Sequence, residues 1–161
     1  MDSVFDENIV LEEIPFDEKL YYTPEEYLLR ERSALDRHEY HNGKVYTMPG
    51  ASKKHNIIAS NLNYELQLHC RKHTSQFVVF QSDLRVHNPL TMRYLYPDIV
   101  IAETATMIFA DQEEDILLTP LTIIEILSKS TENYDRTEKF HVYKGIPSLQ
   151  ECSCFTAHTA Y

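Results

Sequence analysis

The stretch Leu121-Thr122-Ile123-Ile124-Glu125-Ile126-Leu127 is a run of aliphatic residues that carries a single carboxylate. A second stretch, Pro97-Asp98-Ile99-Val100-Ile101, has the same character and an aspartate at its head. β-Branched residues favour strands, and carboxylates are rare on buried strands unless they are paired or bind a metal. We therefore predict two strands here, with Asp98 and Glu125 as candidate functional residues.

Further elements are expected on both sides of these strands. Thr23 and Pro24 are typical of a helix start, and Asn42-Gly43 is the strongest short signal for a hairpin. The expected elements are a helix from Pro24 to about Arg32, a hairpin at 39–46, a helix from Ser52 to about Lys72, a strand at 77–86, and a helix from Ser130 or Thr131 to Lys144. This order predicts the α/β class, as a mixed α+β sheet flanked by helices.

Composition limits the class of protein. The chain has 161 residues, 43% of them hydrophobic and 25% charged, as expected for one soluble domain. The apolar runs are too short to span a membrane, and the first residues do not resemble a signal peptide. Three cysteines do not make a disulfide framework. We therefore expect no membrane association and a cytoplasmic location.

The net charge of -10 argues against broad affinity for nucleic acids, because binding to phosphate is driven by Lys and Arg. The acidic excess is concentrated at the start of the chain. Residues 1–20 contain seven acids and one lysine, a charge of -6, which leaves -4 for the other 141 residues. A cluster of metal-binding carboxylates explains much of that remainder, so a nuclease is not excluded.

Asp98, Glu125 and Lys139 together favour phosphodiester chemistry. Two carboxylates on neighbouring strands provide hard oxygen ligands for Mg²⁺ or Mn²⁺, and a lysine provides a positive charge for the phosphate or the attacking water. Each residue also has a structural explanation. Asp98 could cap a turn, Glu125 could form a buried salt bridge, and Lys139 could pair with Asp135 one helical turn away.

Several segments of the chain resemble successive blocks of one family. They are 39–46, 50–56, 96–100, 125–131, 134–140 and 146–149, and the similarity extends in order over residues 23 to 151. The blocks are similar to those of the Uma-two family of restriction-endonuclease-like proteins, in the PD-(D/E)XK nuclease superfamily. The resemblance implies a restriction endonuclease-like fold, a metal-dependent nuclease acting on DNA, and Asp98 and Glu125 as metal ligands.

The same resemblance makes Glu39 and His55 candidate site residues. Glu39 would be a further carboxylate, or else a hairpin charge paired with Lys44. His55 would meet phosphate or water, or else make a hydrogen bond at its helix start. The superfamily lysine, two residues after the glutamate, is replaced by Leu127. Lys139 would then supply the charge, with Lys129 as the competing donor.

The resemblance also bears on domains and assembly. We expect an acidic arm at 1–22, a nuclease-like domain at 23–151 and an atypical tail at 152–161. A frameshift near codon 152 would explain that tail and imply a C-terminal truncation. Restriction enzymes of this superfamily often form dimers, so a homodimer is expected. The alternative function is an inactive, nuclease-derived domain that binds a partner or oligomerises.

Overall fold

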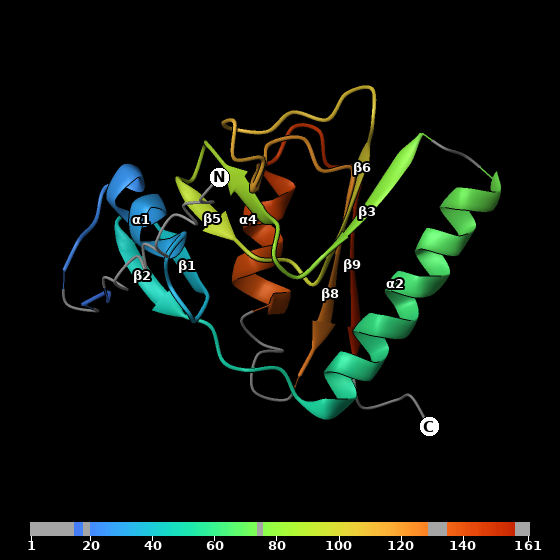
Figure 1. Cartoon of the computed structure of the whole chain (residues 1–161), viewed down its shortest axis with the longest axis horizontal. Coiled ribbons are helices and arrows are strands. Elements are labelled where there is room, and N and C mark those ends of the chain that lie inside the picture. The colour runs from blue at the N-terminus through green and yellow to red at the C-terminus, as the bar shows by residue number, and fades with distance from the viewer. Residues whose placement is uncertain (1–14, 18–19, 74–75, 129–134, 157–161) are drawn as a thin grey trace, which may run out of the picture. The chain divides into compact units, whose positions relative to one another are not determined.

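The computed structural model describes residues 15–17, 20–73, 76–128 and 135–156. The chain divides into an N-terminal unit, residues 1–48, and a C-terminal unit, residues 49–161 (Figure 1). Among the described residues, every helix is too short or too polar to cross a lipid bilayer.

The N-terminal unit contains one helix and one hairpin. Helix α1 (Pro24–Glu31) begins at a capping box, in which the Thr23 side chain accepts a hydrogen bond from the backbone of Glu26 and the Glu26 side chain accepts one from Thr23. Strands β1 (His38–His41) and β2 (Lys44–Thr47) pair antiparallel. Asn42 and Gly43 both have positive φ, as a two-residue hairpin turn requires. The predicted helix and hairpin are confirmed.

The C-terminal unit contains the remaining elements. They are α2 (Lys53–His73), β3 (Phe77–Gln81), β4 (Arg85–Asn88), β5 (Arg93–Leu95), β6 (Ile99–Glu103), β7 (Ile116–Leu117), β8 (Thr122–Leu127), a π-helix (Asp135–Lys139), α4 (Phe140–Lys144) and β9 (Glu151–Thr156). Strands β3, β6, β8 and β9 form a four-stranded sheet in that order, antiparallel except for the β8–β9 pair. Strand β4 pairs with β5 antiparallel and with β7 parallel. The predicted mixed α/β architecture is confirmed.

The expectation of a single strand at 77–86 is wrong. The chain turns sharply after β3, where Ser82 has a φ of 62° and its backbone N–H donates to the carbonyl of Asp98. The next residues then enter β4, which belongs to a different sheet. The left-handed turn at Ser82 ends β3, so the apolar residues before and after Gln81-Ser82-Asp83 belong to two different strands.

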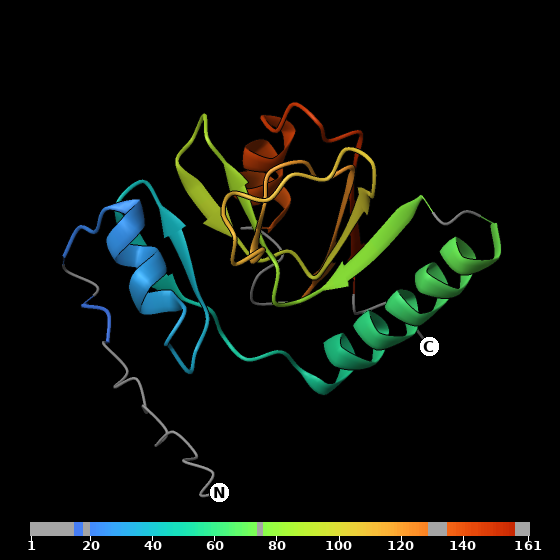
Figure 2. The ribbon, with the colours of Figure 1, turned by 45° about the horizontal axis from the view of Figure 1, so that its top comes forward.

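Helices α2 and α4 lie on opposite sides of the four-stranded sheet (Figure 1, Figure 2). On the α4 side, buried residues from strands of both sheets and from α4 form the main core. Its members are Val86, Leu95, Val100, Ala102, Leu117, Ile123, Val142, Tyr143 and Ile146. Each buried aliphatic side chain contributes about 2 kcal/mol, so this core is the main source of stability of the unit.

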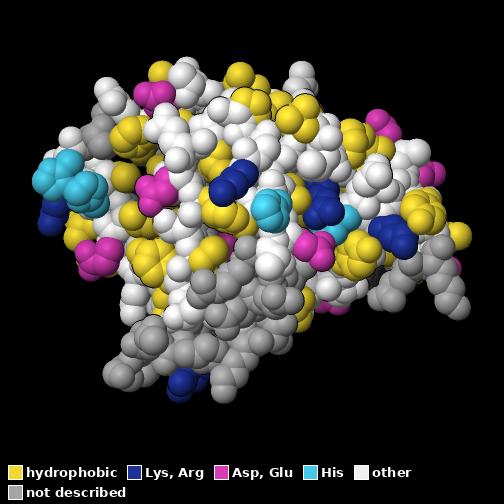
Figure 3. Space-filling view, turned by 180° about the vertical axis from the view of Figure 1, so that it is seen from behind, with side chains coloured by type: hydrophobic (Ala, Val, Ile, Leu, Met, Phe, Trp, Pro, Cys, Tyr) yellow, Lys and Arg dark blue, Asp and Glu magenta, His cyan; other side chains and the backbone are white. Residues whose placement is uncertain are grey.

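The α2 side is much more thinly packed. The structure describes all 21 residues of α2, and Ala59 is the buried one; it packs with Ile126 and half-buried Ile58. The C-terminal end of α2 is polar, and histidine side chains gather there on the face in Figure 3. These are His69 and His73, one helical turn apart with ring centroids 4.6 Å apart. The predicted helix is confirmed, and its apolar face is half-buried.

Candidate active site

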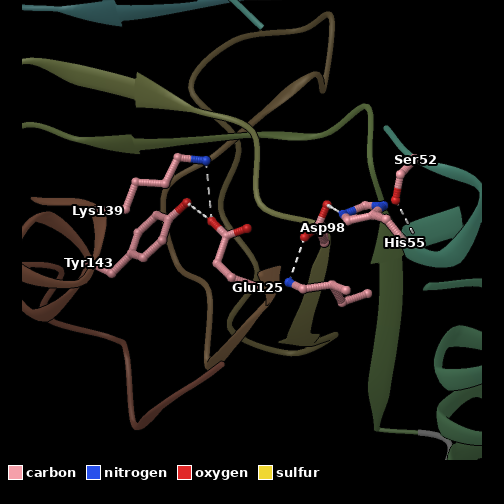
Figure 4. A network of polar contacts seen from close by, with 7 residues as sticks. Ser52, His55, Asp98, Glu125, Lys139 and Tyr143 are labelled. Atoms are coloured by element: carbon pink, nitrogen blue, oxygen red, sulfur yellow. Dashed lines mark hydrogen bonds and ion pairs between the residues drawn. The ribbon is translucent and has the colours of Figure 1, made fainter. Parts of the chain in front are cut away.

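Asp98 lies immediately before β6, and Glu125 lies within β8, the strand that pairs with β6. Strands β6 and β8 pair antiparallel, with Ile99 opposite Ile124. Continuing this register by one residue places Asp98 opposite Glu125. Directly opposed residues of an antiparallel pair project from the same face of the sheet. Both residues therefore lie at the same end of the β6–β8 pair, with the Glu125 carboxylate directed towards Lys139 and Tyr143 and the Asp98 carboxylate directed towards His55 (Figure 4).

Glu125 is held from the α4 side by two donors. It is 3% exposed, and its Oε1 accepts a hydrogen bond of 2.6 Å from the Tyr143 hydroxyl. The Nζ of Lys139 lies 3.5 Å from the same oxygen. Lys139 ends the π-helix and Tyr143 lies in α4, so both side chains reach Glu125 from one continuous segment. π-Helical turns are frequent at functional sites, and this one precedes two contacts to a candidate ligand.

Asp98 is held from the opposite side. Its Oδ2 accepts a hydrogen bond of 2.7 Å from the backbone N–H of Ile126, and its Oδ1 lies 2.9 Å from the Nε2 of His55. The Asp98 side chain is 20% exposed, compared with 4% for Glu125. Asp98 is therefore the more accessible of the two carboxylates to solvent and to a substrate.

His55 reaches Asp98 from the first turn of α2. Its backbone N–H donates to the Ser52 hydroxyl oxygen at 3.2 Å, so the hydrogen bond expected at the helix start exists. The imidazole is a separate contact with Asp98. The hydrogen bond to Asp98 raises the pKa of His55 above 6.5, although burial acts in the opposite direction. Protonation of His55 thus places a positive charge against the Asp98 carboxylate.

The structure brings together Asp98, Glu125, Lys139 and His55, all from the C-terminal unit. Glu39 belongs to the N-terminal unit, where it lies in β1, is 4% exposed and has His41 Nε2 at 3.5 Å. Its role in a site remains a prediction. The competing donor Lys129 and the predicted start of the last helix lie outside the described residues.

Tyr143 contacts the candidate residue Glu125, and the sequence did not single it out for the site. Tyrosine in the apolar pattern of a helix indicates packing against a core. Its spacing offered a signal, since Tyr143 lies four residues after Lys139 and side chains at that spacing share a helix face. The hydroxyl of a buried tyrosine also needs a partner, which is Glu125 here.

The donor set fits a hard divalent cation. The described residues contain no group of three or more His, Cys, Asp or Glu side chains that could hold a metal. Mg²⁺, however, is commonly bound through one or two carboxylates, several waters and the phosphate of its substrate. Two opposed carboxylates, one of them partly exposed, match that requirement. The nearest nitrogen ligand, His55, is hydrogen-bonded to Asp98 and belongs to a class that Mg²⁺ does not prefer.

Comparison with known proteins adds family information to this geometry. The model of the Uma2 family, described as "Putative restriction endonuclease", matches residues 24–157. An uncharacterized protein of Synechocystis sp., sll1609, is 37% identical over 130 residues, which are 80% of this chain and 71% of that protein. A second Synechocystis protein, slr1290, is 35% identical over 80% of this chain and 65% of its own length. The chain thus spans about two thirds of these relatives.

A crystal structure of a "putative nuclease belonging to DUF820" from Anabaena variabilis has a similar fold. The TM-score is 0.63 at 22% sequence identity, and the match covers 81% of this chain and 74% of that one. At this identity the likeness supports the architecture of the sheet and helices.

Proposed function

Because the chain belongs to the Uma2 ("Putative restriction endonuclease") family, we propose that it is a Mg²⁺- or Mn²⁺-dependent endonuclease that hydrolyses DNA phosphodiester bonds. In this proposal Asp98 and Glu125 bind the metal ion, and Lys139 supplies a positive charge for the phosphate or the attacking water. The observation that carries the proposal is the opposed pair of carboxylates, with the Lys139 ammonium beside one of them.

A bound divalent ion would polarise a phosphoryl oxygen and lower the pKa of the attacking water. The side chains of the chain would hold this ion in place. Glu125 is buried and fixed by donors, so it would offer a rigid ligand, whereas Asp98, immediately before the first residue of β6, is partly exposed. A ligand within a strand, such as Glu125 in β8, is held more accurately than a ligand on a loop.

Lys139 takes the role that the superfamily assigns to a lysine two residues after the glutamate. That position is Leu127 here, and its side chain is buried in β8. The Lys139 ammonium reaches Glu125 from the neighbouring helix instead. A positive charge near the same carboxylate is thus retained although its backbone position differs, and it could transfer its contact from Glu125 to a phosphate oxygen.

DNA is the proposed substrate, and a homodimer in the cytoplasm is the proposed form. The net charge of -10 would oppose contact with a polyanion, so the metal and the few cations near the site must supply the attraction. DNA binding is therefore expected to depend strongly on divalent metal and to weaken steeply with salt.

Light scattering on the purified chain would measure whether it forms the proposed homodimer.

The test uses isosteric substitutions of the two carboxylates. We expect Asp98→Asn and Glu125→Gln to abolish Mn²⁺ binding in calorimetry. We also expect both to slow Mg²⁺-dependent nicking of supercoiled plasmid by on the order of 10³-fold, because a catalytic metal supplies several kcal/mol of transition-state stabilisation. Glu65→Gln, an exposed carboxylate on α2, is the matched control and should behave as the wild-type protein.

Two results would overturn the proposal. Nicking that persists in both variants would mean that another site or a contaminant cuts the DNA. A wild-type protein that neither binds Mn²⁺ nor nicks DNA would leave the non-catalytic, nuclease-derived domain as its function.

A further inference from the structure

Tyr143 links the main core to the candidate metal ligand. Its side chain is 1% exposed and packs within the core cluster formed by α4 and both sheets. From this position the hydroxyl donates to Glu125 Oε1 at 2.6 Å. The ring cannot move without disturbing its neighbours, because protein cores are close-packed. The hydroxyl is therefore a fixed point for the Glu125 carboxylate.

The contact fixes the orientation of the carboxylate as well as its position. A hydroxyl donating to an ionised carboxylate makes a short and strong hydrogen bond. The Lys139 ammonium lies near the same oxygen, so both donors act on Oε1. Figure 4 shows Tyr143 and Lys139 on one side of Glu125, and the second Glu125 oxygen directed towards the side on which Asp98 lies.

We propose that Tyr143 is a positioning residue, which holds Oε1 of Glu125 so that the other oxygen is presented, together with Asp98, to a divalent cation. The inference rests on the proposed metal-dependent function. Residues that hydrogen-bond to a metal ligand orient it, and their loss typically weakens metal affinity by 10- to 100-fold. A purely structural Tyr143 would change stability alone.

The experiment compares Tyr143→Phe with wild type in the full chain, by calorimetric titration with Mn²⁺ and by thermal unfolding without metal. Phenylalanine keeps the ring in the core and removes only the hydroxyl. We expect the Mn²⁺ dissociation constant to rise 10- to 100-fold. Tyr64→Phe removes the hydroxyl of a tyrosine that is 63% exposed on α2, and this control should leave the affinity unchanged.

An unchanged Mn²⁺ affinity in Tyr143→Phe, with or without a lower melting temperature, would overturn the positioning role. Wild-type protein that binds no Mn²⁺ would instead overturn the proposed function, and the two failures are therefore distinguishable. If the variant does not fold, the wild-type protein labelled at tyrosine Cζ provides the test. Mg²⁺ should then shift the Tyr143 resonance, and an unmoved resonance would overturn the inference.

Discussion

The two halves of the candidate site are built very differently. Glu125 is almost fully buried and is held by Tyr143 and Lys139, which come from a segment packed into the main core. Asp98 is partly exposed and is held by His55, from a helix that buries little more than Ala59. Since packing determines how far a side chain can move, we infer a rigid ligand on one side and an adjustable one on the other.

Under the proposed function, this asymmetry would suit a site that must admit a large substrate. A buried ligand with fixed geometry lowers the cost of organising a metal, and an exposed ligand leaves room for water and phosphate. The same asymmetry also means that the residues that stabilise the fold and the residues that solvent can reach lie on different sides of the sheet. Substitutions on the α4 side should affect folding strongly, whereas substitutions on the α2 side should have small effects on folding.

The largest expected effect concerns packing on the two sides of the sheet. Ile123→Ala removes a fully buried side chain on the α4 side and should lower the free energy of unfolding by about 3–4 kcal/mol. Ile58→Ala, at a half-buried position of α2, should cost about 1 kcal/mol. Urea unfolding of both variants measures the difference. Equal losses would show that the α2 side is packed as firmly as the α4 side.

Part of this architecture could be predicted from the sequence. The hairpin at Asn42-Gly43 and the strands with Asp98 and Glu125 were predictable because local turn chemistry and aliphatic runs determine them. The break at Ser82 was not, since the left-handed residue is a serine where a glycine would have signalled it. The two-residue strand β7 is too short to show any alternating pattern.

The candidate site was predictable in its residues and not in its geometry. Strands β6 and β8 are joined by a long connection, residues 104–121, so no tight turn determines their register. A shift of one residue would have turned Glu125 to the α2 face. The hydroxyl of Tyr143 likewise reaches Glu125 only when α4 is packed against the sheet. These features depend on tertiary packing, which no local pattern encodes.

A second, somewhat smaller effect should follow from removing the buried cation. Lys139→Met keeps the apolar stem and leaves Glu125 buried without its ammonium partner, which should destabilise the metal-free protein by about 3 kcal/mol. Lys72→Met, at an exposed position in the last turn of α2, is the control and should change stability by less than about 0.5 kcal/mol. A loss in Lys139→Met no larger than in the control would mean that the Glu125 half is not held by this pair.

The smallest expected effect lies on the Asp98 half and depends on pH. The pKa of His55 is raised in the folded state by its hydrogen bond to Asp98, so the folded state binds the proton more tightly than the unfolded state does. The stabilisation by His55 should thus be fully present below about pH 6.5 and be lost as the pH rises through the folded-state pKa. His55→Gln should remove this dependence.

We expect His55→Gln to be less stable than wild type by under about 1 kcal/mol near pH 6, and the two proteins to converge towards about pH 9. Urea unfolding at several pH values, with a chelator present, measures the difference directly. His69→Gln, in the exposed part of α2, is the matched control for adding an amide in place of an imidazole. A difference in stability that stays constant across this pH range would show that His55 acts through packing alone. The charge on His55 would then make no contribution to its contact with Asp98.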